Sequence, residues 1–164
     1  MGMAGTYIAV EELLLRQIIN GDKDILEIDP TQYQTLYVDK SWQAIQYLLC
    51  KDVDGGDPPM YVVPARDENE LNCKFDLSDF NAFYITAKQV KEAAGYLNSL
   101  DVNTLMNMYY FKLMEENKIS PLHGKENEDE ADVFYEYIYF YISKIKNFFD
   151  LTAEKGYAII FYIS

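Results

Sequence analysis

The sequence predicts an α+β domain, in which a small sheet includes a strand from each end of the chain and four or five helices pack mainly on one side. Three observations predict this class. β-Prone runs stand near both termini, segments with a helical hydrophobic period lie between them, and 49% of the 164 residues are hydrophobic. A chain of this size and composition buries one sizeable core, so we expect residues 1–164 to form a single domain.

The first strand is predicted over residues 3–10, where Tyr7 favours extended backbone and Gly5 indicates a close backbone approach. A helix follows and stops at Gly21. The first letters, MGMAGT, also fit the pattern for N-terminal myristoylation. A single acyl chain needs a second, basic membrane signal, and the nearest charged residues here are acidic, so we favour the strand.

The next helix is predicted to run from Asp39, whose side chain suits an N-cap, to about Cys50. Trp42 and Leu49 lie on its apolar stripe. Residues 51–80 show no sustained hydrophobic period and carry several glycines and prolines. We therefore predict an irregular segment there, of a length that is often functional.

A short strand is predicted over residues 82–85. Thr86 and Gln89 follow it with the spacing of a capping box, which predicts the start of a helix. Asp101 can cap a further helix that carries three apolar residues, namely Leu105, Met108 and Leu113.

The last helix combines an acidic start with a broad apolar face. Its acidic residues complement the positive end of the helix dipole, so we interpret them as a solvated helix start: Glu126, Glu128, Asp129, Glu130 and Asp132. The apolar side chains from Val133 to Phe149 occupy about half of the circumference. The helix is therefore either central in the core or shared with a second subunit, and we expect a monomer or a homodimer through this helix.

The chain ends in an unbroken apolar run, residues 157–163, after a helix stop at Gly156. Such a run is typical of a strand that is covered on both faces. We expect this strand to lie beside the first one, because that pairing would hold both ends of the chain in one sheet.

The composition restricts the partners. The chain carries 27 acidic against 14 basic residues and a formal charge of −13. The field of such a protein repels polyanions, so we do not expect nucleic acid as a partner. A basic protein is the partner that this charge favours.

Residues that bind metals or cofactors are sparse. Cys50 and Cys73 lack CxxC spacing and His123 is the only histidine, so they cannot build a four-ligand zinc site. The stretch from Asp52 to Asp57 departs from a calcium loop at three positions, and no phosphate-binding glycine motif is present. We predict neither a metal nor a cofactor.

The compartment follows from two further features. The two thiols fit a reducing environment, and the N-terminus shows no secretory leader. No uncharged apolar run approaches the length that spans a bilayer. We expect a cytoplasmic protein that does not enter a membrane.

Three residues are candidates for a binding site: Asp39, Trp42 and Asp57. Asp57 closely follows the helix that carries the other two, so the three could line one pocket. The alternative is structural, with Asp39 as a helix cap and Trp42 in the core.

Two functions stay open at this stage. The first is a non-catalytic interaction module with an acidic surface, which inhibits a basic partner as an immunity protein does. The second is a small hydrolase that uses Asp39 and Asp57 as paired acid and base. His123 follows a proline in a polar connection and suggests no catalytic triad, so we assign no catalytic residue and favour the first function.

Several motifs, taken in order, resemble the YfbM-like family of uncharacterised bacterial proteins. They are the start Met1-Gly2-Met3-Ala4-Gly5, the stretch Val38-Asp39-Lys40-Ser41-Trp42, the pairs Asp57-Pro58 and Leu100-Asp101, and the final helix with its apolar strand. The resemblance implies an α+β fold in a bacterial cytoplasm. It implies no activity, because the family has none established.

Overall fold

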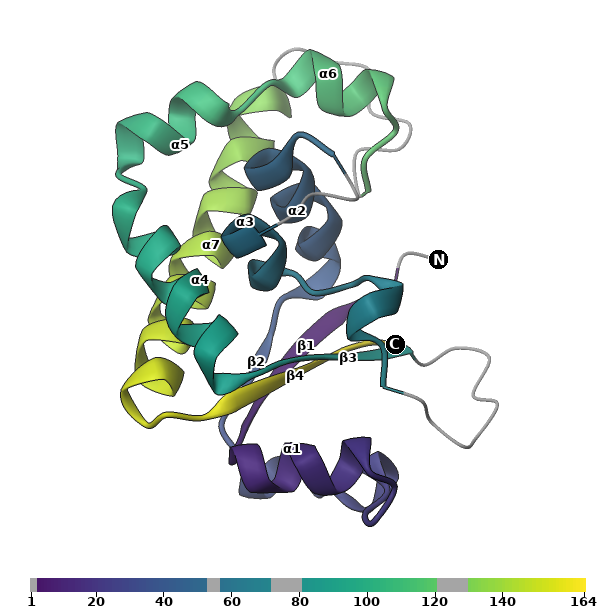
Figure 1. Ribbon diagram of the computed structural model, residues 1–164. Coiled ribbons are helices and arrows are strands. Elements are labelled where there is room, and N and C mark those ends of the chain that lie inside the picture. Colours follow the sequence, from purple (N-terminus) through teal and green to yellow (C-terminus); the bar gives the residue numbers. More distant parts are fainter. Residues whose placement is uncertain (1–2, 53–56, 72–80, 121–129) are drawn as a thin grey trace.

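The fold is built on a four-stranded antiparallel sheet (Figure 1). The computed structural model describes residues 3–52, 57–71, 81–120 and 130–164. The strands are β1 (Gly5–Val10), β2 (Thr35–Tyr37), β3 (Asn81–Ile85) and β4 (Ala158–Ile163), in the order β2-β1-β4-β3. The α+β class predicted from the sequence is therefore confirmed.

The two central strands come from the two ends of the chain. β1 pairs with β4 along its whole length, from Gly5 opposite Ile163 to Val10 opposite Ala158. Two further hydrogen bonds between Ala4 and Ser164, of 2.8 and 3.0 Å, extend the ladder. The predicted pairing of the terminal strands is confirmed.

Each face of the sheet covers its own hydrophobic cluster. Alternate residues of β4 belong to different clusters, with Ile159 and Phe161 on one face and Ala158 and Ile160 on the other. All four side chains are fully buried. The unbroken apolar run of the last strand thus reflects burial on both sides, as predicted.

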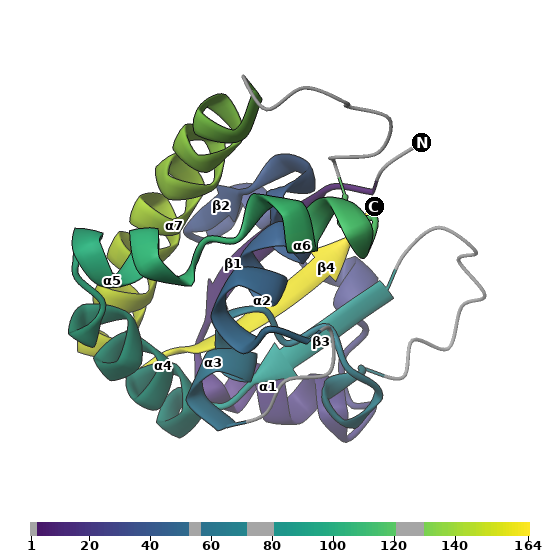
Figure 2. The same cartoon turned by 90° about the horizontal axis from the view of Figure 1, so that it is seen from above.

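The helices are distributed unequally over the two faces. They are α1 (Glu12–Ile19), α2 (Trp42–Cys50), α3 (Asp57–Val62), α4 (Ala87–Ser99), α5 (Val102–Met108), α6 (Phe111–Glu116) and α7 (Glu130–Glu154). In Figures 1 and 2, α1 lies on one face of the sheet and the other helices lie on the opposite face. Packing mainly on one side is confirmed, although the described residues form seven helices rather than four or five.

Two local features account for the larger number of helices. The helix expected after Asp101 is interrupted at Tyr109, whose backbone is extended, and at Tyr110, whose backbone is also non-helical, so Leu113 lies on α6 rather than on α5. The segment expected to be irregular contains α3, whose start Asp57-Pro58-Pro59 places proline in the first turn, where its missing N–H costs nothing. Residues 53–56 and 72–80 of that segment lie outside the described residues.

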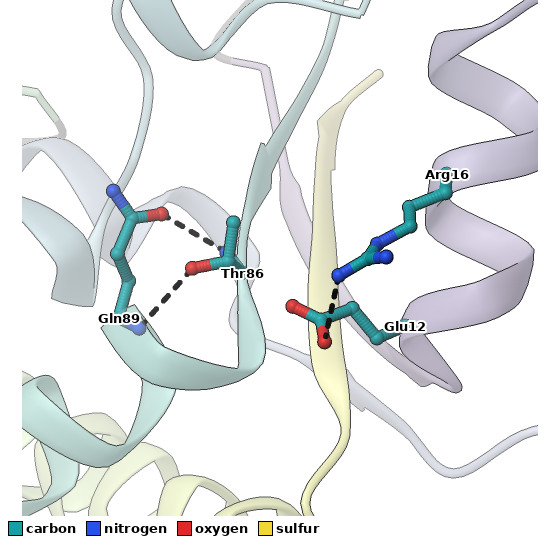
Figure 3. Close-up of polar contacts among 4 residues, drawn as sticks. All are labelled: Glu12, Arg16, Thr86 and Gln89. Carbon is teal, nitrogen blue, oxygen red and sulfur yellow. Dashed lines mark hydrogen bonds and ion pairs between the residues drawn. The ribbon is translucent and has the colours of Figure 1, made fainter.

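The predicted caps of α4 and α5 are present. Figure 3 shows the capping box of α4, in which Thr86 N–H donates to Gln89 Oε1 at 2.9 Å and Gln89 N–H donates to Thr86 Oγ1 at 3.3 Å. Asp101 accepts from the Thr104 N–H at 2.7 Å. These bonds satisfy amides that would otherwise lack partners at the helix starts.

An ion pair on α1 contributes less to stability than the helix caps do. It joins Arg16 to Glu12 at 3.7 Å, one turn apart (Figure 3). Because the Arg16 side chain is 71% exposed and the Glu12 side chain 37%, water screens the pair and it contributes little stability.

The long helix α7 ends at Gly156, which adopts a left-handed φ of 67°. Its inner residues are buried in the core: Phe134, Ile138, Ile142, Ile145, Phe148 and Phe149. Val133, which the sequence places on this face, is 66% exposed, because it lies on the same side of the helix as Glu136 and Phe140, which are also exposed. Of the predicted acidic start, Glu130 and Asp132 lie in the first turn, and residues 126–129 lie outside the described residues.

Tyr7 lies at the point where the sheet meets the helices. Its side chain is fully buried, and its hydroxyl donates to the Val62 carbonyl at 2.6 Å, which links β1 to α3. Its ring contacts those of Phe148, Phe149 and Phe161, with centroids 4.7 to 6.0 Å away. Strand and helices therefore share one aromatic cluster.

Among the described residues, none of the helices has the length and apolar character needed to cross a membrane.

Gly5 allows the close approach that the sequence predicts. A Cβ added at this position would stand 2.8 Å from the Phe161 ring and 3.1 Å from Val38. Because the Phe161 ring is fully buried, it cannot move aside. We predict that Gly5→Ala lowers the free energy of unfolding by about 2 kcal/mol, measured by urea denaturation.

The matched control for this substitution is Gly95→Ala. Gly95 lies within α4, and a Cβ there would meet no atom within 4 Å. Alanine at this position should stabilise the protein by about 1 kcal/mol. If Gly5→Ala proved as stable as the wild type, the proposed approach between β1 and Phe161 would be wrong.

Candidate functional site

Asp39 occupies a tight turn between β2 and α2 rather than the cap of a helix. It begins a single 3-10 turn, Asp39–Ser41, with a left-handed φ of 49°. No side chain caps α2; instead, the Ser41 hydroxyl donates back to the Val38 carbonyl at 2.5 Å. The predicted capping role of Asp39 is wrong, because its carboxylate bonds to tyrosines rather than to the helix amides.

Two tyrosines from distant parts of the chain donate to the Asp39 carboxylate. The Tyr137 hydroxyl on α7 lies 2.9 Å from Oδ2, and the Tyr37 hydroxyl on β2 lies 3.4 Å from Oδ1. The Tyr141 ring stands edge-on to that of Tyr137, with centroids 5.1 Å apart. We call Asp39, Tyr37, Tyr137 and Tyr141 the Asp39–tyrosine cluster.

The phenols of this cluster remain protonated at neutral pH. Burial raises the pKa of Tyr137 well above its usual value, and the hydrogen bond to Asp39 and the charge of Asp39 raise it further. Burial and the Asp39 charge also raise the pKa of Tyr37 and of Tyr141. The hydroxyls are therefore hydrogen-bond donors and not bases.

The cluster lies at the surface. Asp39 is half-buried, whereas Tyr37 is 58% exposed. No ion pair joins Asp39 to a cationic residue in the part of the chain that the structure describes. A half-buried carboxylate at the surface beside aromatic rings can bind a cation, through its charge and through the negative face of each ring.

Trp42 is anchored by contacts within the protein. Its indole N–H donates to the Met3 carbonyl at 2.9 Å, and its ring stands edge-on to Phe161 at 6.4 Å. The side chain is half-buried against the core. These contacts hold the segment that precedes β1 against the start of α2, which agrees with the structural alternative for this residue.

Asp57 belongs to a different element. It is exposed at the first position of α3, with a φ of 56°. α3 packs on α4 and α2, and no hydrogen bond links Asp57 to Asp39 or Trp42 among the described residues. Of the three candidates, the structure thus brings only Asp39 into a cluster of interacting functional groups.

Two surface hollows lie elsewhere. One, of about 290 Å³, lies where the end of β1 meets the start of β4, and it includes Glu11, Tyr33 and Lys155. The other, of about 500 Å³, lies on α7 beside Phe140. Neither is lined by the residues predicted from the sequence.

Metal binding has no support within the described ranges, which contain no group of three or more His, Cys, Asp or Glu residues that could hold an ion. Three features examined in the sequence lie outside the described residues: His123, Cys73 and residues 53–56 of the calcium-like stretch.

The tyrosines of the cluster were not predicted as site residues. Tyr37 immediately precedes the Val38-Asp39 motif, so its neighbourhood to Asp39 is visible in the chain. Tyr137 is 98 residues away from Asp39, and the sequence placed it among the core positions of the last helix. Only the packing of α7 beside β2 and the Asp39 turn brings the two together.

Comparison with known proteins places the chain in a family. The model of a domain of unknown function, DUF1877, matches residues 1–162. The chain belongs to the DUF1877 family. No curated protein matches it.

A solved structure has a fold similar to that of this chain. The crystal structure of YfbM from Escherichia coli, a protein of unknown function, is similar to this DUF1877 chain with a TM-score of 0.77 and 18% sequence identity. The match covers 99% of this chain and 100% of that one. The resemblance to YfbM-like proteins is confirmed; at this identity the likeness establishes the fold alone.

The half-buried hydrogen bond of Tyr137 predicts a pH dependence of stability. In the unfolded chain a tyrosine releases its proton near pH 10.0, whereas folded Tyr137 retains it to higher pH. Above pH 10.0 the unfolded state binds fewer protons, so stability falls as pH rises. We predict that Tyr137→Phe reduces this alkaline slope and costs about 1 kcal/mol at neutral pH, measured by urea unfolding over a pH series.

Tyr110→Phe is the matched control. Tyr110 is 63% exposed, so its substitution should leave the slope unchanged. Identical alkaline slopes in wild type and Tyr137→Phe would contradict the assignment of a half-buried phenol–carboxylate bond.

Proposed function

We propose that this protein is a non-catalytic interaction module for a basic partner protein, and that the Asp39–tyrosine cluster receives an arginine or lysine side chain of that partner. One observation carries the proposal. A surface carboxylate is held between two tyrosine hydroxyls, beside exposed aromatic surface, and has no cationic counterpart within the described residues.

The geometry of the cluster suits recognition. The 2.9 Å bond from Tyr137 orients the carboxylate, and the longer contact from Tyr37 at 3.4 Å supports it, so less conformational freedom is lost when a partner binds. The ring of Tyr37 is exposed beside it, which offers a face on which a planar guanidinium can stack. An arginine can pair with the carboxylate and stack on the ring at the same time.

The net negative charge of the whole chain also favours a basic partner. An excess of 27 acidic over 14 basic residues creates a field that accelerates the approach of a basic protein. The cluster then supplies a specific contact within that general attraction. Inhibition of a basic enzyme, as by an immunity protein, is the role that this combination supports best.

The proposal includes a cytoplasmic setting. Cys50 is a free thiol, which fits a reducing compartment.

The chemistry of the cluster favours binding over catalysis. A carboxylate acid–base pair requires two groups that face one substrate. The oxygens of Asp39 accept from phenols, while Asp57 is exposed at the start of α3. No specific contact in the structure supports the paired-carboxylate hydrolase.

Removal of the Asp39 charge tests the proposal. Asp39→Asn preserves the shape of the side chain and tolerates the left-handed backbone, but it abolishes the negative charge. We predict that it weakens the binding of a fluorescently labelled hexa-arginine peptide about tenfold at low salt, measured by fluorescence anisotropy. Binding by the wild type should weaken as the salt concentration rises.

Asp57→Asn is the matched control, since it removes the same charge from an exposed site away from the cluster. It should change the affinity by less than about twofold. Equal losses in the two variants would show that only the overall charge matters, and absence of hexa-arginine binding by the wild type would also contradict the proposal.

A further inference from the structure

The outer face of α7 carries apolar side chains in water. The outer face of α7 is defined here by five residues that recur at the spacing of one helix face: Val133, Glu136, Phe140, Lys144 and Asn147. Val133 is 66% exposed and Phe140 is 53% exposed. Figure 2 shows α7 along the margin of the molecule, so this face is open to a partner.

The side chains of this face leave a shallow, open depression beside Phe140. The hollow measures about 500 Å³ and is lined by Glu136, Tyr139, Phe140, Ser143, Lys144 and Asn147. Two aromatic rings supply its apolar surface, and one acid and one base flank them. An occupant that complements this hollow presents an apolar group together with one charge of each sign.

The charge of this part of α7 differs from that of the whole chain. Residues 133–149 contain one glutamate and two lysines, whereas the whole chain carries a formal charge of −13. Two copies of an acidic protein repel each other over most of their surfaces. Residues 133–149 do not add to this repulsion, because their formal charge is slightly positive.

We propose that two copies of this chain form a homodimer through the outer face of α7, with the helices antiparallel and the two-fold axis at Phe140. A two-fold interface brings the same patch of each subunit together, so each contact occurs twice. The aromatic rings of Tyr139 and Phe140 in each copy then pack against the shallow depression on the other copy.

The charges on the outer face fit this symmetry. Glu136 precedes Phe140 by four residues and Lys144 follows it by four. In an antiparallel pair centred on Phe140, Glu136 of one copy therefore lies level with Lys144 of the other. The interface contains two such ion pairs, related by the axis.

Within one copy these two charges do not pair. They lie eight residues apart, which is about 12 Å along the helix. Lys144 instead holds its ammonium 4.5 Å from the centroid of the Phe140 ring, which places it at the centre of the outer face. Neither residue takes part in an ion pair in the described part of the chain.

Charge reversal provides the sharpest test. We predict that the wild type is a dimer by sedimentation equilibrium at concentrations up to about 0.5 mM. E136K and K144E should each weaken self-association by roughly tenfold or more, because each variant places like charges opposite each other twice. The double variant E136K/K144E should restore the dimer.

A mixture of the two single variants should form a heterodimer. One subunit then presents two lysines and the other two glutamates, so both ion pairs are restored across the interface. Phe140→Asp should abolish dimer formation. All variants should retain the circular dichroism spectrum of the wild type, because the substituted side chains are exposed.

The matched controls are E92K and K91E on the exposed surface of α4, which change the net charge equally and should leave the dimer intact. A wild type that stays monomeric over this range would overturn the proposal. So would a dimer that tolerates Phe140→Asp, or single variants that fail to associate when mixed.

The dimer is independent of the proposed function. Asp39→Asn should leave self-association unchanged, whereas E136K should bind the hexa-arginine peptide no worse than E92K does. The peptide-binding assay and the measurement of self-association therefore test the proposed function and the proposed dimer independently of each other.

Discussion

The pairing of β1 with β4 is the contact on which the rest of the structure depends. It joins residues near position 5 to residues near position 163, so it closes almost the entire chain into one loop. Closing a loop of this length costs conformational entropy, which the hydrogen-bonded ladder and the burial on both faces must offset. β2 then adds to one side of this pair and β3 to the other, and the helices cover the faces that the four strands form.

Helix α7 connects this central pair to the surface. Its C-terminal half packs Phe148 and Phe149 against Tyr7 of β1, immediately before the chain enters β4. Another side of the helix brings Tyr137 to Asp39, and its outer face presents Phe140 to solvent. Three different surfaces of one helix thus serve the core, the Asp39–tyrosine cluster and the proposed dimer, and the β1–β4 pair fixes the orientation of all three.

Much of this architecture is visible in the sequence, because it rests on local patterns. The capping box at Thr86 involves only residues three positions apart, whereas the apolar run before the C-terminus and the glycine at position 5 are patterns whose residue types themselves indicate a buried strand and a close approach. The features that the sequence did not reveal depend on distant contacts. Asp39 has the chemistry of a helix cap, but its left-handed backbone and Tyr137 on α7 direct it elsewhere. Tyr109 and Tyr110 interrupt a segment whose hydrophobic period continues, so the break between α5 and α6 cannot be read from periodicity.

Native-state hydrogen exchange tests the central role of the β1–β4 pair most directly. We expect the amide protons of β1 and β4 to exchange only when the whole protein unfolds. The free energy of opening measured from their exchange then equals the free energy of unfolding measured by urea denaturation. The amides of α1, which lies on the face of the sheet opposite the other described α-helices, exchange through smaller openings. Exchange of the β1 or β4 amides at a free energy well below the global value, while α4 and α7 remain protected, would contradict this account.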